Sequence, residues 1–264
     1  MEREFALITG ASAGMGLAFA RQLASQGYAL ALLSNREEEL DRAAEGLRGQ
    51  FDVPVHTLCI DLALPGAAEA VLQWCDDQGL QPKILVNNAG MFFMEYLSPE
   101  GLGKVRSMMT LHMDTVTELC ILFGARMKEC GGGRILNMAS MTARIPAPGI
   151  AIYAATKAYL KSFGKSFSYE MRPFGVSVTT VCPAAVDTGL YPLGNRLRKV
   201  LRRIGLVRSP EWLVQRALRS MFRGRRQVSP GLMNFVLPPL VAALPDRLKD
   251  TLGMRWIYNR SRNS

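Results

Sequence analysis

The sequence contains little histidine and little cysteine. Only His56, His112 and five scattered cysteines occur among 264 residues, and no two cysteines have CxxC spacing. Because zinc and iron–sulfur sites need closely spaced ligands of these types, we expect no metal site formed by the protein. An odd set of unclustered thiols favours free cysteines in a reducing compartment, so we expect a cytoplasmic protein.

A long hydrophobic run is also lacking. No stretch of about eighteen uninterrupted apolar residues is present, so we expect no membrane-spanning helix. The first strand pattern begins at Glu4, so we expect no signal peptide. Repeats and low-complexity linkers are absent as well. The 48% hydrophobic content is typical of a packed globular protein, and the length predicts one domain over residues 1–264.

Acidic residues are scarce in one part of the chain. The segment 196–226 contains eleven Lys and Arg residues against one acid, Glu211, so it carries a charge of +10, equal to the net charge of the whole chain. These cations either form solvated helix faces or attract an anionic substrate, an acidic phosphopantetheine carrier or an anionic membrane surface. No nucleic-acid partner is expected, because no recognition module accompanies the segment.

Short apolar runs alternate with amphipathic stretches such as Met15–Gln26 and Glu37–Leu47. The predicted strands are Glu4–Thr9, Ala29–Ser34, Val55–Ile60, Ile84–Asn87, Arg134–Ala139 and Val176–Cys182. Their continuous apolar character indicates burial on both faces. The alternation predicts an α/β fold with a doubly wound parallel sheet, in which ligands bind at the carboxyl ends of the strands.

A glycine-rich turn follows the first predicted strand and opens a helix. Its sequence, Thr9-Gly10-Ala11-Ser12-Ala13-Gly14-Met15-Gly16, has GxxxGxG spacing. Glycines permit a sharp turn and a close approach of the backbone to a pyrophosphate, whose charge is favoured at a helix N-terminus. A packing turn gives the same letters, so this turn alone does not decide the function.

The end of the second strand bears on the identity of a dinucleotide. An acid there accepts hydrogen bonds from a ribose 2′-hydroxyl, whereas a guanidinium pairs with a 2′-phosphate. The chain has Ser34-Asn35-Arg36 at this place, with no acid before Glu37. NADP(H) is therefore the expected cofactor. Asp61 and Leu62, at the end of the third strand, either cap the next helix or touch the adenine.

Tyr153 and Lys157 lie four residues apart in a predicted helix, Ile152–Met171, and Ser140 precedes Tyr153 by thirteen residues. The spacing puts the phenol and the ammonium on one helix face. A fixed positive charge lowers the pKa of a phenol from its usual value of about 10. The pair therefore predicts acid–base chemistry on a carbonyl or an alcohol.

Together these motifs resemble the short-chain dehydrogenase/reductase family from Phe5 to about Gly231. The matching motifs are Thr9-Gly10-x3-Gly14-x-Gly16, Asp61-Leu62, Asn87-Asn88-Ala89-Gly90, Ser140 and Tyr153-x3-Lys157. The resemblance implies a Rossmann-like fold, a nicotinamide cofactor and chemistry without a metal. The cofactor-binding residues expected from the motifs and the resemblance are Thr9, Gly10, Ser12, Gly14, Met15, Gly16, Arg36, Asp61, Leu62, Asn88, Ala89, Gly90, Tyr153, Lys157, Pro183, Val186 and Thr188.

The resemblance also implies catalytic roles. Tyr153 would protonate the carbonyl oxygen during reduction, or act as the base in the reverse direction. Ser140 would hydrogen-bond that oxygen, and Lys157 would hold the nicotinamide ribose while lowering the pKa of the tyrosine. Two hydroxyls aimed at the oxygen would stabilise the charge that hydride transfer builds there.

Two positions depart from the family pattern. The family's active-site asparagine, which kinks a helix and holds a water of the proton relay, falls at His112. We count His112 among the catalytic residues and favour a retained relay, because histidine donates and accepts protons near neutrality. The alternatives are a core histidine and reduced activity. The second departure is Ala184, which follows Pro183 where the family usually has glycine, although Thr188 still matches.

The substrate-binding part of the chain is expected to be apolar. Residues 184–226 predict a helical substrate lid with basic helices, and residues 227–264 a final strand and a tail, in which Leu232–Leu244 forms core or a pocket wall. Met91-Phe92-Phe93-Met94 follows the Asn88 turn, and soft apolar side chains suit a lipid-like ketone. The layout of residues 228–231 resembles the branch that includes long-chain 3-oxoacyl reductases and hydroxysteroid dehydrogenases.

The main hypothesis is therefore an NADPH-dependent reductase of a hydrophobic ketone, either 3-oxoacyl or steroid-like, or the reverse oxidation. A reductase of a 3-keto-sphingoid base or of a polyketide is the alternative among enzymes. A weakly catalytic, cofactor-binding or membrane-associated protein is the alternative outside them, and His112 is the feature that favours it. The resemblance further implies a homodimer or homotetramer, formed through helices around Leu111–Cys130 and Tyr153–Met171.

Overall fold

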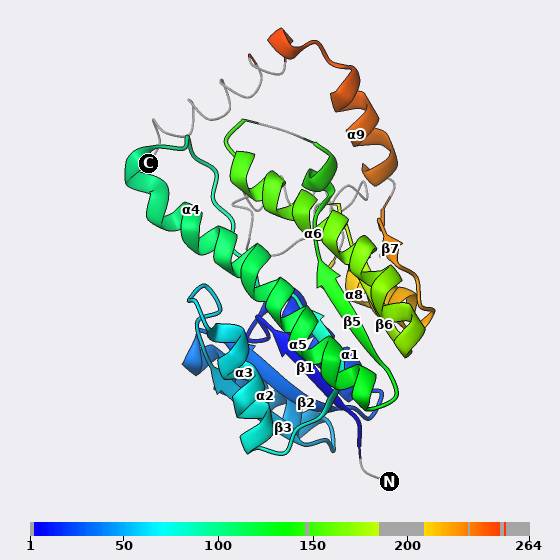
Figure 1. Cartoon of the computed structure of the whole chain (residues 1–264). Helices are drawn as coiled ribbons and strands as arrows, with labels where there is room; N and C mark the ends of the chain where they lie inside the picture. Colours follow the sequence, from blue (N-terminus) through cyan, green and yellow to red (C-terminus); the bar gives the residue numbers. More distant parts are fainter. Residues whose placement is uncertain (1–2, 146–147, 185–208, 232, 249–250, 252–264) are drawn as a thin grey trace.

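The computed structural model describes residues 3–145, 148–184, 209–231, 233–248 and 251. Seven parallel strands form one sheet in the order β3-β2-β1-β4-β5-β6-β7 (Figure 1). The strands are β1 (Phe5–Thr9), β2 (Ala29–Ser34), β3 (Val55–Cys59), β4 (Pro82–Asn87), β5 (Gly133–Met138), β6 (Val176–Val181) and β7 (Gln227–Val228). The expectation of a parallel α/β sheet is confirmed, and all six strands predicted from the sequence are present with ends shifted by two residues at most.

Helices connect the strands and cover both faces of the sheet. They are α1 (Gly14–Ala24), α2 (Glu37–Gln50), α3 (Ala67–Asp77), α4 (Leu102–Met109), α5 (Thr115–Glu129), α6 (Ala151–Met171), α8 (Pro210–Phe222) and α9 (Met233–Ala243). Single turns are η1 (Pro99–Gly101), η2 (Thr110–Asp114), η3 (Met141–Arg144) and η4 (Arg172–Phe174). The helix predicted over Ile152–Met171 is α6, which begins one residue earlier.

Two buried clusters define the layers. One joins α1, α2 and α8 to one face of the sheet and contains Phe19, Leu40 and Leu213. The other joins α3, α5 and α6 to the opposite face and contains Phe123 and Leu160. Both faces of the central strands are therefore buried, which explains why their sequences are apolar throughout and do not alternate between apolar and polar residues.

The chain reverses direction along the sheet between β1 and β4. It proceeds from β1 outward to β2 and β3, and then returns to place β4 on the other side of β1. In such sheets the loops that leave the two central strands part at their carboxyl ends and leave a crevice. The Thr9–Gly16 turn follows β1 and the Asn88–Gly90 turn follows β4, so the fold brings these two motifs to one crevice.

The C-terminal helix α9 departs from expectation. Residues 232–244 were expected to form core or a pocket wall. Phe235, Val236 and Leu240 of α9 are exposed, so they are not core, and the pocket wall remains a prediction. Only Asn234 and Pro238 of this helix are buried among the residues whose side chains are described. The core expectation was wrong because apolar composition alone does not show whether a helix has a neighbour to pack against. None of the described helices is both long and apolar enough to cross a bilayer.

Candidate active site

The glycine turn after β1 has the backbone that its sequence predicts. Gly10 and Gly14 have φ values of 63° and 56°, which other residues rarely adopt. A Cβ at Gly16 would lie 2.8 Å from Asn88 Nδ2 and would overlap the carbonyl of Gly10, whereas a Cβ at Gly14 would meet nothing within 4 Å. The turn is therefore tightly packed where Gly16 meets Gly10 and Asn88, and it is open at Gly14, where α1 begins.

The start of α1 suits an anion. The helix begins at Gly14, and its N-cap residue Ala13 provides no side-chain acceptor for the amides of the first turn. Such amides point along the helix axis and carry the positive end of the helix dipole. The open space at Gly14 and these amides fit a dinucleotide pyrophosphate.

Hydrogen bonds tie the β4 turn to the glycine turn. The amides of Asn88 and Ala89 donate to Thr9 Oγ1 at 3.0 and 2.9 Å, and Asn88 Nδ2 donates to the carbonyls of Thr9 and Gly10 at 3.0 and 3.2 Å. A Cβ at Gly10 would lie only 2.9 Å from Ala89 Cα. The two turns thus form one rigid floor at the switch point of the sheet.

The end of β2 presents hydroxyls and one arginine. Ser34 Oγ donates to Ser12 Oγ at 3.0 Å and accepts from the Arg36 amide at 3.2 Å. The side chain of Arg36 is 66% exposed, and its guanidinium pairs with Glu39 at 3.1 Å. Arg36 therefore lies at the rim where a 2′-phosphate would bind, but Glu39 competes for it.

The remaining predicted cofactor residues have structural partners. Asp61 Oδ1 accepts from the Ala63 amide at 2.9 Å in the turn after β3. It does not cap the next helix, because α3 begins at Ala67 with Gly66 as its N-cap and has no side-chain cap, and the contact with the adenine remains a prediction. Leu62 is a core residue whose carbonyl accepts from Thr115 Oγ1 at 2.8 Å. Pro183 is buried, and its carbonyl accepts from the Met141 amide at 2.8 Å. Val186, Thr188 and most of the expected lid lie outside the described residues.

The three expected catalytic side chains are buried at the carboxyl end of β5. Ser140 follows β5 and caps η3, where its Oγ accepts from the Thr142 amide at 3.2 Å. Tyr153 and Lys157 lie on one face of α6, with Lys157 Nζ 5.6 Å from the centre of the tyrosine ring. Each of the three is at most 5% exposed. The arrangement is that of a water-poor acid–base site.

Lys157 is a buried cation with one backbone acceptor. Its Nζ donates to the carbonyl of Met138 at 3.1 Å. Burial lowers the pKa of this ammonium from 10.5 to about 8, so it remains mostly charged at neutral pH. An ammonium has three donors, and this one retains capacity for ribose hydroxyls in addition to Met138.

His112 occupies the π-helical turn η2 between α4 and α5 and is 0% exposed. The amide of Met91 donates to its Nε2 at 3.1 Å, and its Nδ1 lies 3.0 Å from Thr156 Oγ1. Burial, followed by the positive charge of Lys157, holds the pKa of His112 well below 6.5. The imidazole is therefore neutral at physiological pH, with protein partners at both nitrogens.

Thr156 was missed in the sequence. Its Oγ1 contacts His112 and donates to the carbonyl of Tyr153 at 2.9 Å, so it connects the imidazole to α6. The only signal available was a hydroxyl three residues after Tyr153 and directly before Lys157. That signal does not identify His112 as the partner, because the two residues are 44 positions apart.

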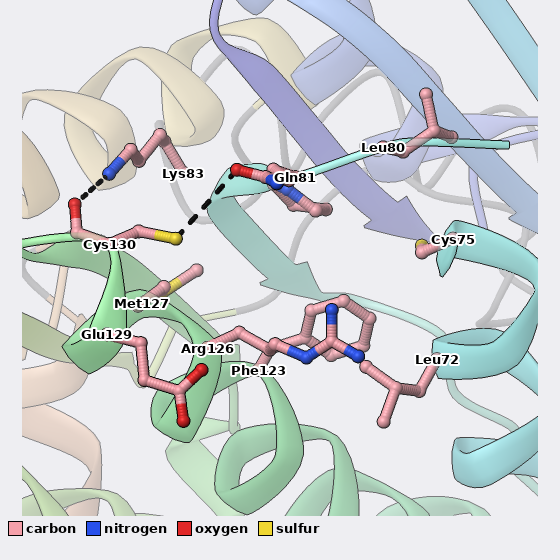
Figure 2. A pocket seen from close by; sticks show the side chains of 11 residues that line it. Leu72, Cys75, Leu80, Gln81, Lys83, Phe123, Arg126, Met127, Glu129 and Cys130 are labelled. Carbon is pink, nitrogen blue, oxygen red and sulfur yellow. Dashed lines mark hydrogen bonds between the residues drawn. The ribbon is translucent and has the colours of Figure 1, made fainter. Parts of the chain in front are cut away.

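A pocket of about 170 Å³ lies away from these residues (Figure 2). It is between α3, α5 and the start of β4, at the amino end of the sheet. Its lining residues are Leu72, Cys75, Leu80, Gln81, Pro82, Lys83, Phe123, Arg126, Met127, Glu129 and Cys130. None of them belongs to the candidate site, so the pocket carries no argument about its chemistry.

Comparisons with known proteins agree with this geometry. Residues 4–194 match the family model described as short chain dehydrogenase. The chain is 28% identical over 260 residues to the very-long-chain 3-oxoacyl-CoA reductase of Homo sapiens, across 97% of this chain and 77% of that protein. The mouse protein of that name is matched over 61% of its length.

Solved structures agree as well. A short-chain dehydrogenase from Sphingobium yanoikuyae in complex with NADPH has a TM-score of 0.75 at 28% identity, over 92% of this chain and 96% of that one. A bulky-bulky ketone specific alcohol dehydrogenase from Comamonas testosteroni has a TM-score of 0.75 at 26% identity, over 97% of this chain and 93% of that one. The expected resemblance is confirmed, and the chain belongs to the short-chain dehydrogenase family.

Proposed function

We propose that the chain is an NADPH-dependent oxidoreductase that reduces a hydrophobic ketone, either 3-oxoacyl or steroid-like, to the secondary alcohol, or catalyses the reverse reaction. The observation that carries the proposal is the burial of Ser140, Tyr153 and Lys157 after β5 and on α6, where Lys157 Nζ would lie 3.8 Å from a Cβ at Gly90 in the turn after β4. A module that only binds a nucleotide has no need of a serine, a tyrosine and a lysine at this place.

The side chains divide the work. NADPH, when bound, supplies a hydride to the carbonyl carbon. The hydroxyl of Tyr153 donates its proton to the carbonyl oxygen, and Ser140 donates a hydrogen bond to the same oxygen as negative charge develops. Lys157 holds the ribose and favours the tyrosinate that is left, which takes its next proton from solvent. One hydride and one proton convert the ketone to the alcohol.

The residues that would hold the cofactor come from three strand ends, those of β1, β2 and β4, and from α6. The Gly10–Gly16 turn and the start of α1 would accommodate the pyrophosphate. The Asn88–Gly90 turn would serve the nicotinamide half, and Lys157 would bind its ribose. The absence of an acid at the end of β2 and the presence of Arg36 favour NADPH over NADH. The NADPH complex of the Sphingobium yanoikuyae protein supports this preference.

The substrate proposal rests on the apolar surroundings of Tyr153. Met91, Phe92, Phe93 and Met94 pack against Met108, Ile150 and Tyr153. The relatives include a very-long-chain 3-oxoacyl-CoA reductase and a bulky-bulky ketone specific alcohol dehydrogenase, and both support a large apolar ketone. A 3-keto-sphingoid base or a polyketide satisfies the same chemistry and is the alternative.

Oxidation of NADPH at neutral pH tests the proposal. The panel contains 3-oxoacyl thioesters, ketosteroids and aromatic ketones, with NADH and Tyr153→Phe as controls. We expect turnover with NADPH, and a loss of roughly 10²–10⁴-fold in Tyr153→Phe, because the phenol supplies the proton. The Kd for NADPH should stay within about threefold of wild type, since the phenol acts on the substrate. Undiminished turnover in the variant would refute the mechanism.

A further inference from the structure

The bonds of His112 fix its tautomer. A backbone amide only donates, so Nε2 of His112 must accept from Met91, and the ring proton must be on Nδ1. Nδ1–H then donates to Thr156 Oγ1, whose own hydrogen goes to the carbonyl of Tyr153. All donors in this chain of three hydrogen bonds have acceptors, and the chain runs in one direction from residue 91 to α6.

Such an imidazole is poorly arranged to shuttle protons. Nε2 has one lone pair in the ring plane, and the Met91 amide already uses it. Protonation of Nε2 would set two N–H groups against each other and break the link to residue 91. Lys157 is a nearby positive charge and also opposes a second proton on the ring. The geometry therefore favours a role in which the imidazole holds the backbone of Met91 over a role in which it relays protons.

The segment held in this way borders the reacting group. Met91 begins the apolar segment 91–94, and the ring of Phe92 meets that of Tyr153 edge-on at 5.0 Å between centroids. The imidazole itself contacts Tyr153 at 5.8 Å between centroids. A change in the position of residue 91 would shift the apolar surface beside the tyrosine without touching its hydroxyl.

We propose that His112 is a positioning residue, whose neutral imidazole links the backbone of Met91 to Thr156 and thereby fixes the apolar segment 91–94 beside Tyr153. The inference rests on the proposed function, since segment 91–94 determines substrate affinity only if Tyr153 acts on an apolar ketone. It assigns His112 to substrate binding, whereas a relay would assign it to the proton transfer.

Two substitutions of His112 separate its hydrogen bond with Met91 from its hydrogen bond with Thr156. The amide of asparagine reaches the position of Nδ1 and can bond Thr156, but it is too short to reach Met91. The amide of glutamine reaches the position of Nε2, where its oxygen can accept from Met91. His112→Gln should therefore keep the bond that positions segment 91–94, and His112→Asn should lose it.

The kinetic test uses 3-oxododecanoyl-CoA, which carries an apolar tail, and acetoacetyl-CoA, which does not, at saturating NADPH. In His112→Asn we expect the KM for the long thioester to rise roughly tenfold, with kcat within about threefold of wild type. The KM for the short thioester should change less. His112→Gln should remain within about threefold of wild type in both parameters. Asparagine is the family's relay residue at this position, so a relay predicts that kcat falls in His112→Gln and is retained in His112→Asn, with KM unchanged in both. That result would overturn the proposal.

Amide exchange tests the link without turnover. In the chain without ligand, the Met91 amide should exchange at least about tenfold faster in His112→Asn than in wild type or His112→Gln. Equal exchange in the two variants would overturn the proposal. If wild type turns over neither thioester nor any ketone of the panel, the proposed function fails, and exchange alone decides the inference.

A variant at another position tests the bond between Met91 and His112 in case His112→Asn does not fold. A Cβ at Gly90 would lie 3.2 Å from His112 Nε2, close enough to push the imidazole away from residue 91. Gly90→Ala should therefore also speed exchange of the Met91 amide, while thermal unfolding shows that the fold is kept. Wild-type protection of this amide in a folded Gly90→Ala variant would contradict the proposed link.

Discussion

Lys157 illustrates a conflict between stability and chemistry at a single residue. Its ammonium is buried, and the pKa of about 8 is well below the value of 10.5 for a solvated lysine. Below pH 8 the folded chain carries the full cost of burying this charge. Between pH 8 and 10.5 the unfolded chain binds more protons than the folded chain, so stability rises with pH across this window.

We therefore predict that Lys157→Met abolishes turnover and yet raises the free energy of unfolding by about 1–3 kcal/mol at pH 7. The gain should shrink as the pH rises from 8 toward 10.5. Urea denaturation of the ligand-free wild type and variant at several pH values measures the difference. Activity of the wild type should fall above about pH 8, where the ammonium loses its proton. A destabilised variant at pH 7 would contradict the assigned burial cost.

Arg36 tests the choice of cofactor at the residue scale. Its guanidinium is exposed at the end of β2 and pairs with Glu39 in the ligand-free chain. We predict that Arg36→Ala raises the Kd for NADPH roughly tenfold and leaves the Kd for NADH within about twofold, because only NADPH carries the 2′-phosphate.

Glu39→Gln is the matched control for Arg36. It frees the guanidinium from its present partner, so it should lower the Kd for NADPH or leave it unchanged. Fluorescence titration with both nucleotides measures these constants. Equal changes for NADPH and NADH in Arg36→Ala would refute the contact with the 2′-phosphate.

At the scale of elements, the approach of α6 to β6 places Tyr153 and Lys157 over the sheet. The contact is close because Gly164 faces the sheet, where a Cβ would overlap Thr180 Oγ1. Thr180 is fully buried. A larger residue at position 164 would push α6 away from the strands.

Gly164→Ala should therefore lower the free energy of unfolding by about 2–3 kcal/mol. Adding Thr180→Ala should restore much of the loss, because the nearest remaining atom of residue 180 would be its Cβ, at 3.4 Å. Denaturant unfolding of the two single variants and the double variant gives the coupling energy.

Gly46 provides the control for this helix contact. It lies in α2 and is exposed, and a Cβ there would meet nothing within 4 Å. Gly46→Ala should stabilise the chain by about 0.5–1 kcal/mol through helix propensity alone. For the pair 164 and 180, additive changes in the free energy of unfolding would contradict the prediction. They would show that the Cβ at position 164 does not overlap Thr180 Oγ1 in the folded variant.

At the scale of the whole molecule, the net charge of +10 is concentrated in residues 196–226. In the described part of this segment, α8 buries Leu213, Leu218 and Met221 against the core, while Arg216, Arg219 and Arg223 are exposed. The helix is thus amphipathic, as the solvated-face alternative expects. Its arginines are nevertheless available to an anionic surface.

We predict that the chain sediments with vesicles containing phosphatidylserine at about 0.05 M salt and is released at about 0.5 M, since screening weakens each arginine contact. Replacing Arg216, Arg219 and Arg223 together by Gln should abolish binding. Replacing the exposed Arg21 and Arg42 by Gln removes cations from α1 and α2 and should have a smaller effect. Binding that resists salt, or equal losses in both sets, would count against a surface role for α8.

The sequence alone determined the sheet, the glycine turn and the helix that carries Tyr153 and Lys157. Buried parallel strands are apolar throughout, and a four-residue spacing fixes two side chains on one helix face, so local patterns suffice for these features. The cofactor roles of Val186 and Thr188 remain predictions, as do the lid and the oligomer. The core expectation for residues 232–244 was wrong, because apolar composition does not reveal whether a helix finds a neighbour.

Only the tertiary structure decided the partners of His112, the pairing of Arg36 with Glu39 and the burial of Lys157. Met91 and Thr156 are 21 and 44 residues from His112, and Gly164 meets Thr180 across two elements. Such contacts depend on how closely packed helices and strands approach one another, and no periodicity in the chain records that distance. The sequence therefore names the groups to which we assign the chemistry, and the packing of α4–α6 determines which backbone and side-chain atoms hold them in place.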